Sequence, residues 1–286
     1  MSYIPIFIIV HNQLEVLKQT IRSYEKYIKT PFKIVYHNVA STYEPTIQFL
    51  KEQELLGCAV YHTSINNHHT VIETIDDYLH KHPECEYYVM TDPDIELDSV
   101  NGDILDVYIH ILKNTNAISV GPMLRIDDIP DFYPRKELAI WSHTQQFWDP
   151  DIPKHHGSFK GTQFSFISCD TDTTFQLSSV KNRPTTFPHS LSVRVFSPYS
   201  ARHLDWYIDP NNLTPCQQYY QLTHQFHHNI LVKLYVQKMM IVILSANERY
   251  VLETVNVIML QSYQPHRQFQ LQDLILMINH LKGLFL

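Results

Sequence analysis

Glycine is scarce in this chain: its 286 residues include six glycines, and the first of them is Gly57. Dinucleotide-binding Rossmann sites and P-loops need a glycine-rich turn after the first strand, so that backbone N–H groups can approach phosphates. Here the expected first strand, Ile4–Val10, runs directly into the polar residues His11 and Asn12. The sequence therefore argues against both classes. Sugar nucleotidyltransferases also favour a glycine-rich first loop and are disfavoured for the same reason.

Cysteine pairs and long apolar runs are also missing. The four cysteines are scattered along the chain and include no Cys-x-x-Cys pair, which indicates reduced thiols rather than a disulfide framework or a zinc ribbon. The N-terminus lacks the basic start and small-residue cleavage site of a signal peptide. The nearest approach to a membrane span, residues 230–244, is interrupted by Lys233 and Lys238 and is too short to cross a bilayer. We therefore expect a cytoplasmic location.

Positive charge is not in excess either, because the formal net charge is -7. That balance argues against a protein that coats nucleic acid, so we expect no nucleic-acid partner. The hydrophobic content of 44% and charged content of 18% are ordinary for a globular protein. If the ligand is an anionic phosphate, the overall field does not attract it, and a local cation has to do so.

Strands and helices alternate through about the first 125 residues. Continuous apolar runs at Ile4–Val10 and Tyr87–Thr91 predict strands that are buried on both faces. Apolar residues at helical spacing follow the first strand from Leu14 and stop before Thr30. We expect further strands at 32–36, 59–62 and 117–124, and further helices at 45–56, 71–80 and 104–112. This order predicts an α/β fold with an open, mostly parallel, Rossmann-like sheet and helices on both faces.

Two carboxylates follow the strand Tyr87–Thr91, because Asp92 and Asp94 flank Pro93. Side chains two residues apart on an extended chain point the same way, and Pro93 cannot continue a ladder of hydrogen bonds. Like charges on one side repel each other unless a cation lies between them. Mg²⁺ and Mn²⁺ accept such oxygen ligands together with substrate phosphates. The alternative is a solvated acidic turn, since Asp-x-Asp is common by chance.

The predicted sheet order supports a ligand site at this point. Ligands in parallel sheets bind beyond the carboxyl ends of the strands, where the loops after several strands converge. Three such loops carry polar side chains here. The residues concerned are His11 and Asn12 after the first strand, His37 and Asn38 after the second, and Asp92 and Asp94 after the fourth.

The alternation breaks down after residue 125. Prolines punctuate an aromatic stretch over residues 130–153, which forms either an acceptor cleft or ordinary core. We expect strands at 172–177 and 191–196. Residues 230–244 and 271–286 carry apolar residues at helical spacing, which predicts a helical extension. That extension packs on the main domain or provides a peripheral membrane or homodimer contact.

Several sequence strings occur together: TDPDIEL, VGPMLRIDDIPDFYP, FW, DTDTTFQL and PYSARHLDWYID. In this order they resemble a group of family-2-type glycosyltransferases with the GT-A fold from bacterial surface-polysaccharide clusters. The resemblance covers roughly residues 3–228. It implies a GT-A domain over residues 1–228, with a donor-binding half over about 1–125 and an acceptor half over about 126–228. Residues 229–286 match no pattern and are assigned to the helical extension.

The resemblance also implies an activity and its site residues. Such enzymes transfer a sugar from a nucleotide donor, usually UDP-linked, to a hydroxyl of a glycan or glycolipid, with Mn²⁺ or Mg²⁺ at the diphosphate. Asp92 and Asp94 would be metal ligands, with Asp94 the more direct one, and His203 would complete the site. A lone histidine is more often structural, and that alternative stays open for His203. The implied donor-binding residues are His11, Asn12, His37, Asn38, Asp92, Arg125 and Arg202.

The catalytic base is expected among three aspartates, because an inverting transfer needs a carboxylate to accept the proton of the acceptor hydroxyl. We rank Asp172 first because it lies 78 residues after Asp94 at the start of a strand-like segment. Asp127 and Asp128 are the other candidates, and they could instead hold hydroxyls of the donor sugar beside Arg125. A surface ion-pair cluster is the alternative for this group.

Two positions depart from the family pattern. His37 stands where an aspartate is expected, and Ser142 stands after Trp141 where a glutamate is expected. A neutral histidine can form a hydrogen bond to the donor but supplies no fixed anion. These departures keep a second interpretation open, in which the chain binds a nucleotide sugar without catalysing transfer. A sugar nucleotidyltransferase is the third.

Overall fold

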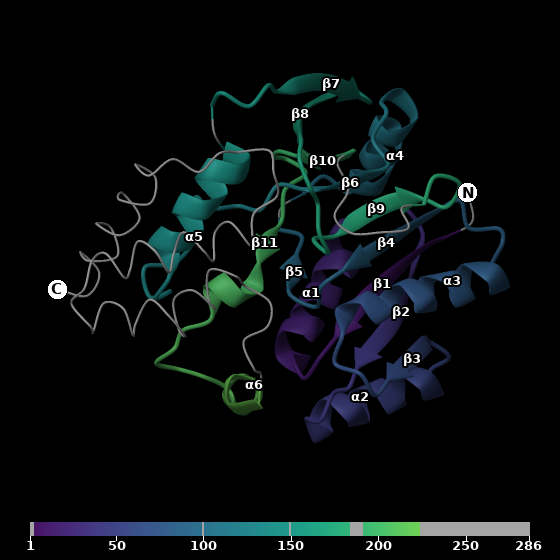
Figure 1. Ribbon diagram of the computed structural model, residues 1–286, viewed down its shortest axis with the longest axis vertical. Helices are drawn as coiled ribbons and strands as arrows, with labels where there is room; N and C mark the ends of the chain where they lie inside the picture. The colour runs from purple at the N-terminus through teal and green to yellow at the C-terminus, as the bar shows by residue number, and fades with distance from the viewer. Residues whose placement is uncertain (1–2, 99, 149, 184–190, 224–286) are drawn as a thin grey trace, which may run out of the picture. The chain divides into compact units, whose positions relative to one another are not determined.

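A nine-stranded sheet forms the centre of the computed structural model, which describes residues 3–98, 100–148, 150–183 and 191–223 (Figure 1). The strand order is β3-β2-β1-β4-β9-β6-β10-β8-β7. The bounds are β1 Ile4–Val10, β2 Phe32–Val39, β3 Ala59–Thr63, β4 Tyr87–Thr91, β6 Ser119–Pro122, β7 His155–Phe159, β8 Thr162–Ser168, β9 Gln176–Ser179 and β10 Ser192–Val195.

Most strands of this sheet run in one direction. The pairs β1·β2, β2·β3, β1·β4 and β6·β10 are parallel. Strand β9 is antiparallel to both of its neighbours, and β8 is antiparallel to both of its neighbours. Seven of the nine strands therefore point the same way, and only β8 and β9 are reversed. The predicted mostly parallel α/β sheet is confirmed.

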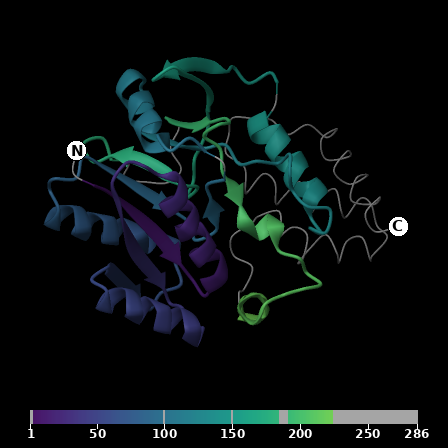
Figure 2. The same cartoon turned by 180° about the vertical axis from the view of Figure 1, so that it is seen from behind.

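Helices cover both faces of the sheet. The helices are α1 Leu14–Tyr27, α2 Glu44–Leu55, α3 Val71–Lys81, α4 Ile104–Asn114, α5 Lys136–His143 and α6 Pro215–Thr223, with a π-helical turn at Thr144–Trp148. Alternate side chains of β1 join two separate cores: Ile6 packs with Leu17 of α1, whereas Phe7 packs with Val71 of α3. Figure 1 and the reverse view in Figure 2 show α1 and α3 on opposite sides of β1.

A second, two-stranded sheet brings distant parts of the chain together. Strand β5, Ile95–Glu96, pairs antiparallel with β11, Arg202–His203. A 3₁₀ helix, Leu204–Tyr207, follows β11 directly, and another, His68–Thr70, precedes α3. The small sheet places the segment after β4 beside residues about a hundred positions later, and both lie beyond the carboxyl end of β4.

Several predicted boundaries need correction. Strand β2 continues to Val39, so His37 and Asn38 lie within the strand, paired with Ile9 and Val10, and not in a loop after it. The strand predicted at 172–177 begins at Gln176, because a turn occupies the residues before it. Strand β6 is shorter than predicted, ending at Pro122. Helix α5 and the strands β7 and β8 were not predicted.

The chain divides into a unit of residues 1–221 and a unit of residues 222–286. The predicted helical extension at 229–286 lies outside the described residues, as does any membrane or dimer contact through it. No helix in the described part of the chain combines the length and apolar character that crossing a membrane requires.

Candidate metal centre

Three side chains converge where β4 ends. Asp94 follows β4, His203 lies on β11, and Asp205 lies in the 3₁₀ helix after it; one ligand atom of each lies within 4.8 Å of the others. The pairing of His203 with Ile95 brings these segments together. The backbone N–H of Leu204 also donates to the carbonyl oxygen of Asp94 at 2.7 Å. The position of the cluster is therefore fixed by backbone hydrogen bonds.

Two polar atoms of this cluster are buried without a hydrogen-bond partner: Oδ1 of Asp94 and Nδ1 of His203. Only 4% of Asp94 is exposed, and its Oδ2 lies 3.5 Å from His203 Nδ1. Buried polar groups that lack partners are costly and rare in native proteins. A cation between these atoms would satisfy both. A set of two carboxylates and one imidazole suits Mn²⁺, which accepts nitrogen as well as oxygen ligands.

The electrostatics of the cluster indicate the same need. Burial raises the pKa of Asp94 well above its usual value, and the nearby Asp205 carboxylate raises it further. Burial also raises the pKa of Asp205. Grouped carboxylates with raised pKa values are a feature of functional sites, since only a counter-charge lets them ionise together.

Neighbouring side chains orient two of the three candidate ligands, His203 and Asp205. The indole ring of Trp206 stacks on the imidazole of His203, with ring centroids 5.2 Å apart and planes 12° from parallel. Gln13, at the start of α1, donates from Nε2 to Oδ1 of Asp205 at 3.3 Å. Such contacts around a ligand hold its geometry and tune its affinity for metal.

Asp92 lies beside the cluster and is bound to the turn that precedes β9. Its backbone N–H donates to the carbonyl oxygen of Thr173 at 2.9 Å, and its Oδ2 accepts a hydrogen bond from the hydroxyl of Thr173. Burial raises its pKa, and the charges of Asp94 and Asp172 add to the rise. The direct role of Asp92 as a metal ligand stays a prediction.

Asp172 is exposed and lies in this same turn. Its charge acts on Asp92 and also on His68, whose pKa is lowered mainly by burial and raised in part by Asp172. The carboxylate thus lies close enough to Asp92 to raise its pKa while remaining open to solvent. Its role as the base stays a prediction.

Arg125, Arg202, Asp127 and Asp128 form an ion-pair network with Asp98. Arg202 contacts Asp98 at 2.6 Å and donates two hydrogen bonds to Asp128. Arg125 contacts Asp128 at 3.0 Å and Asp98 at 3.3 Å, and it also binds Asp127 at 3.1 Å. The ion-pair arrangement considered from the sequence is therefore present. Since neighbours on a strand point to opposite faces, Arg202 faces away from the side that His203 occupies.

Asn12 uses its side chain inside the protein. Its backbone is left-handed, with φ 59°, and its Oδ1 accepts from the backbone N–H groups of Thr42 and Tyr43 at 2.6 and 2.8 Å. Its Nδ2 donates to the hydroxyl of Thr42 at 3.2 Å. This side chain ties the loop after β1 to the start of α2, and its predicted contact with a donor stays untested.

The other predicted donor-binding residues are also held by internal hydrogen bonds. His11 Nδ1 lies 2.6 Å from the carbonyl oxygen of Val39. Both ring nitrogens of His37 lie 2.8 Å from threonine hydroxyls, and Asn38 bonds to His62 at 2.9 Å. His37 is 2% exposed and Asn38 is 7% exposed, so both side chains are buried and offer little polar surface at the carboxyl edge of the sheet.

Sequence reasoning missed Asp205 and Tyr220. Asp205 lies two residues after His203 in the string PYSARHLDWYID, so the motif contained it without marking it. Tyr220 is on α6, where burial and the charges of Asp205, Asp94 and Asp92 raise its pKa, and its ring lies 6.4 Å from that of His11. Nothing in the sequence around Tyr220 indicated this position.

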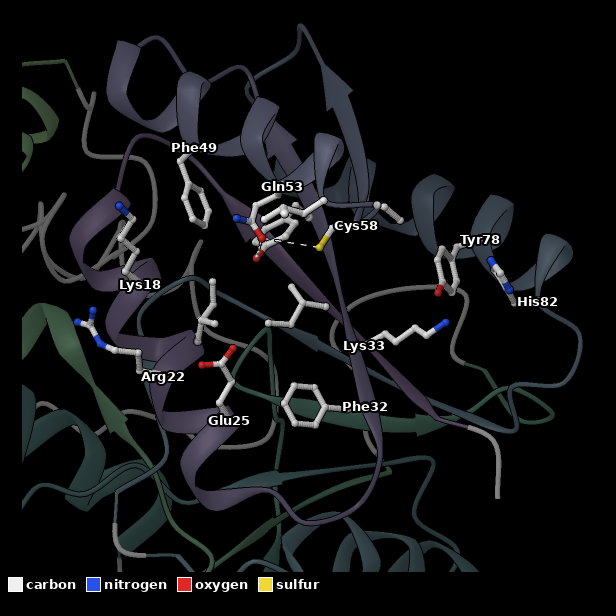
Figure 3. Close-up of a pocket in the computed structure, with 16 residues that line it drawn as sticks. Lys18, Arg22, Glu25, Phe32, Lys33, Phe49, Gln53, Cys58, Tyr78 and His82 are labelled. Carbon is white, nitrogen blue, oxygen red and sulfur yellow. Dashed lines mark hydrogen bonds between the residues drawn. The ribbon is translucent and has the colours of Figure 1, made fainter.

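A groove of about 730 Å³ lies away from this cluster, between α1 and α2 and beside the first residues of β2 and β3 (Figure 3). Lys18, Arg22, Lys33 and Glu25 line it together with Phe49 and other side chains. None of the residues that line this groove was predicted from the sequence as a metal ligand, a donor-binding residue or a catalytic residue. Because it lies at the amino ends of the strands, it is separate from the candidate metal centre.

Comparison with known proteins gives partial structural matches. No family model and no curated protein matches the sequence. S. aureus TarS 1-349 in complex with UDP-GlcNAc is 16% identical over 44% of this chain and 35% of that chain, with TM-score 0.32. The mannosyltransferase PcManGT from Pyrobaculum calidifontis, in complex with GDP-Man and Mn²⁺, is 16% identical over 44% and 36%, also with TM-score 0.32.

A third match has similar strength. Glucosyl-3-phosphoglycerate synthase from Mycobacterium tuberculosis, in complex with Mn²⁺ and UDP-glucose, is 13% identical over 49% of this chain and 50% of that chain, with TM-score 0.31. The chain thus matches half or less of the length of each of these three proteins.

Proposed function

We propose that the chain is a metal-dependent glycosyltransferase of the GT-A type, which transfers a sugar from a nucleotide-sugar donor, UDP-linked in our proposal, to a hydroxyl of a glycan or glycolipid. The observation that carries the proposal is the buried pair of unpartnered atoms on Asp94 and His203, with Asp205 beside them. All three residues belong to the strings TDPDIEL and PYSARHLDWYID, on which the sequence resemblance rests. Two independent kinds of observation therefore support one site.

In this proposal Asp94, His203 and Asp205 hold Mn²⁺ or Mg²⁺, with Asp92 next to them. When bound, the ion supplies a Lewis acid that neutralises the charge on the departing nucleoside diphosphate. A chain without a glycine-rich phosphate loop needs such a cation, because its net charge of -7 does not attract a diphosphate. Trp206 keeps the plane of the His203 ring fixed by stacking on it.

Asp172 acts as the base in the proposed reaction. As the acceptor oxygen forms its bond to the anomeric carbon and the bond from that carbon to the phosphate oxygen breaks, Asp172 accepts the proton of the acceptor hydroxyl. Its exposure suits this role, since the acceptor has to reach it. Asp127, the most exposed carboxylate of the arginine network, and Asp128 bind hydroxyls of the donor sugar.

A first experiment separates the three functions considered. Thermal-shift screening of nucleotide sugars with and without Mn²⁺, followed by product analysis, should give Mn²⁺-dependent stabilisation and sugar transfer. Stabilisation without turnover would favour a nucleotide-sugar-binding protein. Formation of a nucleotide sugar from a sugar phosphate would favour a nucleotidyltransferase.

The variant Asp94→Ala tests the metal centre. We expect loss of Mn²⁺-dependent stabilisation, of transfer and of donor hydrolysis, with an unchanged circular dichroism spectrum. Asp131→Ala is the matched control, because the Asp131 side chain is 98% exposed and its removal should leave all three readouts unchanged. Full activity of the Asp94→Ala protein would refute the metal assignment.

The variant Asp172→Asn tests the base. Asparagine keeps the size of the side chain but cannot accept the proton, so donor and Mn²⁺ binding should persist while the transfer rate falls by about 10²-fold or more. Isothermal titration and initial-rate measurements on the same preparation separate the two effects. An unchanged turnover rate would move the base to another carboxylate.

A further inference from the structure

Arg194 on β10 is a buried cation that donates hydrogen bonds to three backbone carbonyls. It is 4% exposed, and its guanidinium donates to the carbonyl oxygens of Asp170 at 2.7 Å, Thr171 at 3.0 Å and Pro122 at 3.2 Å. It also lies over the ring of Phe147 at 4.8 Å. None of the ion pairs found among the described residues includes it. Burying an arginine outside an ion pair is costly, and the nearby Cys169, Asp172 and Asp170 offset only part of that cost. The three hydrogen bonds to carbonyl oxygens therefore require an explanation.

Two of those carbonyls belong to the segment that leads into the turn before β9. The N–H of Thr174 donates to the carbonyl oxygen of Thr171 at 3.2 Å, which closes the turn. Asp172 and Phe175 have left-handed backbones, with φ 50° and 43°. That conformation is uncommon for residues other than glycine and persists only where the surroundings impose it.

The packing around the turn leaves it little freedom. Gly121 on β6 lies against it: a Cβ at this position would come within 3.0 Å of the Thr174 carbonyl oxygen and 3.1 Å of Thr171 Cγ2. The hydroxyl of Thr171 lies 3.3 Å from that of Ser119. Arg194 therefore binds the residues at the start of the turn, and β6 packs against the turn through Gly121 and Ser119.

The far side of the turn contacts the candidate metal centre. Thr173 donates its hydroxyl hydrogen to Oδ2 of Asp92 and accepts from the N–H of Asp92 through its carbonyl oxygen. Asp172, between Thr171 and Thr173, is the candidate base. The same turn therefore contains Thr173, which is hydrogen-bonded to Asp92, and Asp172, the candidate base. Arg194 fixes the position of the first residues of this turn.

We propose that Arg194 is a positioning residue for the candidate site, acting through the turn at residues 171–174 on Asp92 and Asp172. The proposal rests on the glycosyltransferase function proposed above. The planar fork of arginine can bind the carbonyls of two successive residues together, whereas the compact ammonium of lysine cannot reproduce that geometry. Arginine is therefore required here for its shape, not only for its charge.

The test compares Arg194→Lys and Arg194→Met with Thr173→Val. The valine variant removes the hydroxyl that donates to Asp92. Hydrogen–deuterium exchange of peptides covering residues 86–97 and 168–178 reports on the hydrogen bonds between Thr173 and Asp92, and it needs neither metal nor substrate. Mn²⁺ titration of the folded protein and separate kcat and KM values report on the site. Arg183→Lys is the control, because Arg183 pairs with Asp76 at 2.6 Å on a different segment.

In Arg194→Lys we expect faster exchange in both peptides, unchanged exchange in α3, and Mn²⁺ affinity lowered about tenfold. The fall in kcat should exceed any change in donor KM, because the base is displaced. The double variant Arg194→Lys/Thr173→Val should lose less than the sum of the two single losses, since both act through one turn.

A purely structural role would lower Tm in Arg194→Lys and leave the two peptides and the Mn²⁺ affinity of the folded molecules as in the wild type. That result would overturn the positioning role. If Arg194→Met fails to fold, the lysine variant and Thr173→Val still decide the question. If Arg194→Lys shows faster exchange at both peptides but the wild-type protein binds no Mn²⁺, the proposed function is contradicted. The effect of Arg194 on the position of Asp92 would still be established.

Discussion

His37 shows how one residue can take the place of an expected functional group and serve the fold. Its Nε2 and Nδ1 atoms each lie 2.8 Å from a hydroxyl, those of Thr70 and Thr74. Burial lowers its pKa from 6.5 to about 4. The ring is therefore neutral at physiological pH and links β2 to α3. The departure from the family pattern at this position is thus accompanied by a structural role.

The shifted pKa of His37 predicts a pH dependence of stability. A depressed folded-state pKa means that the unfolded chain binds the proton first, so the contribution is present above pH 6.5 and is lost as pH falls towards about 4. The loss amounts to roughly 3 kcal/mol over that range. Urea unfolding at several pH values should show a shallower decline in His37→Gln than in the wild type. Parallel curves for the two proteins would contradict the assignment.

At the residue scale the sequence carried part of the site. Asp94 and His203 were grouped as ligands because they lie in two recognisable strings, and the structure brings their side chains together with Asp205. Tyr220 and Arg194 could not be found in this way. Their positions depend on where α6 and β10 pack, and no local pattern in the sequence encodes that packing.

Among the elements, the junction of β1 with α2 depends on Asn12. Its Oδ1 accepts hydrogen bonds from the N–H groups of Thr42 and Tyr43, the two residues that directly precede α2. Helix α6 adds to the junction, since Cys216 donates to the carbonyl oxygen of Asn12 and Tyr219 donates to the hydroxyl of Thr42. Asn12 thus connects β1, α2 and α6 through its side chain and its backbone carbonyl.

We expect Asn12→Ala to lower the free energy of unfolding by roughly 1–3 kcal/mol, because the N–H groups of Thr42 and Tyr43 lose their acceptor. Asn12→Asp should lose less, since a carboxylate still accepts and aspartate tolerates the left-handed backbone. Asn12→Gly keeps the backbone conformation without the acceptor and isolates the hydrogen bonds. Chemical denaturation of the three variants measures the differences. Equal stability of the alanine variant and the wild type would refute the stabilising role of these hydrogen bonds.

Elements with a strong local signal were predictable and others were not. Continuous apolar runs gave β1 and β4 at their observed bounds. The β7–β8 hairpin was missed, although Lys160 and Gly161 adopt left-handed φ angles of 48° and 83°, as a tight two-residue turn requires. Strand β7 is short and mostly polar, and the apolar alternation of β8 is confined to Phe164 and Phe166, so periodicity gave only a weak signal. Strand β5 has two residues and exists only because β11 pairs with it.

For the molecule as a whole, the raised pKa values of Asp92, Asp94 and Asp205 link metal, proton and stability. Without metal, their protonated forms stabilise the fold below the unfolded pKa, and this contribution is lost as pH rises through the folded pKa values. In the proposed function Mn²⁺ binds the ionised forms, so its stabilising effect should grow as the pH rises through these pKa values.

Thermal unfolding with and without Mn²⁺ checks this dependence. At a concentration one hundred times Kd, Mn²⁺ should stabilise the protein by about 2.7 kcal/mol near neutral pH and by much less in mildly acidic buffer. Asp94→Asn should remove most of the stabilisation by Mn²⁺ near neutral pH, so that little difference between the two pH values remains. An Mn²⁺ effect that is the same at both pH values would contradict the involvement of these carboxylates.

The reversal of β9 has a practical consequence for engineering the protein. Because β9 runs against β4 and β6, the chain enters it at the site edge through the turn at residues 171–174 and leaves it, after Ser179, at the opposite edge. The next strand, β10, starts from that opposite edge at Ser192. A peptide tag, a fluorescent reporter or a protease cleavage sequence inserted between Ser179 and Ser192 would therefore be joined to the scaffold far from the carboxylates.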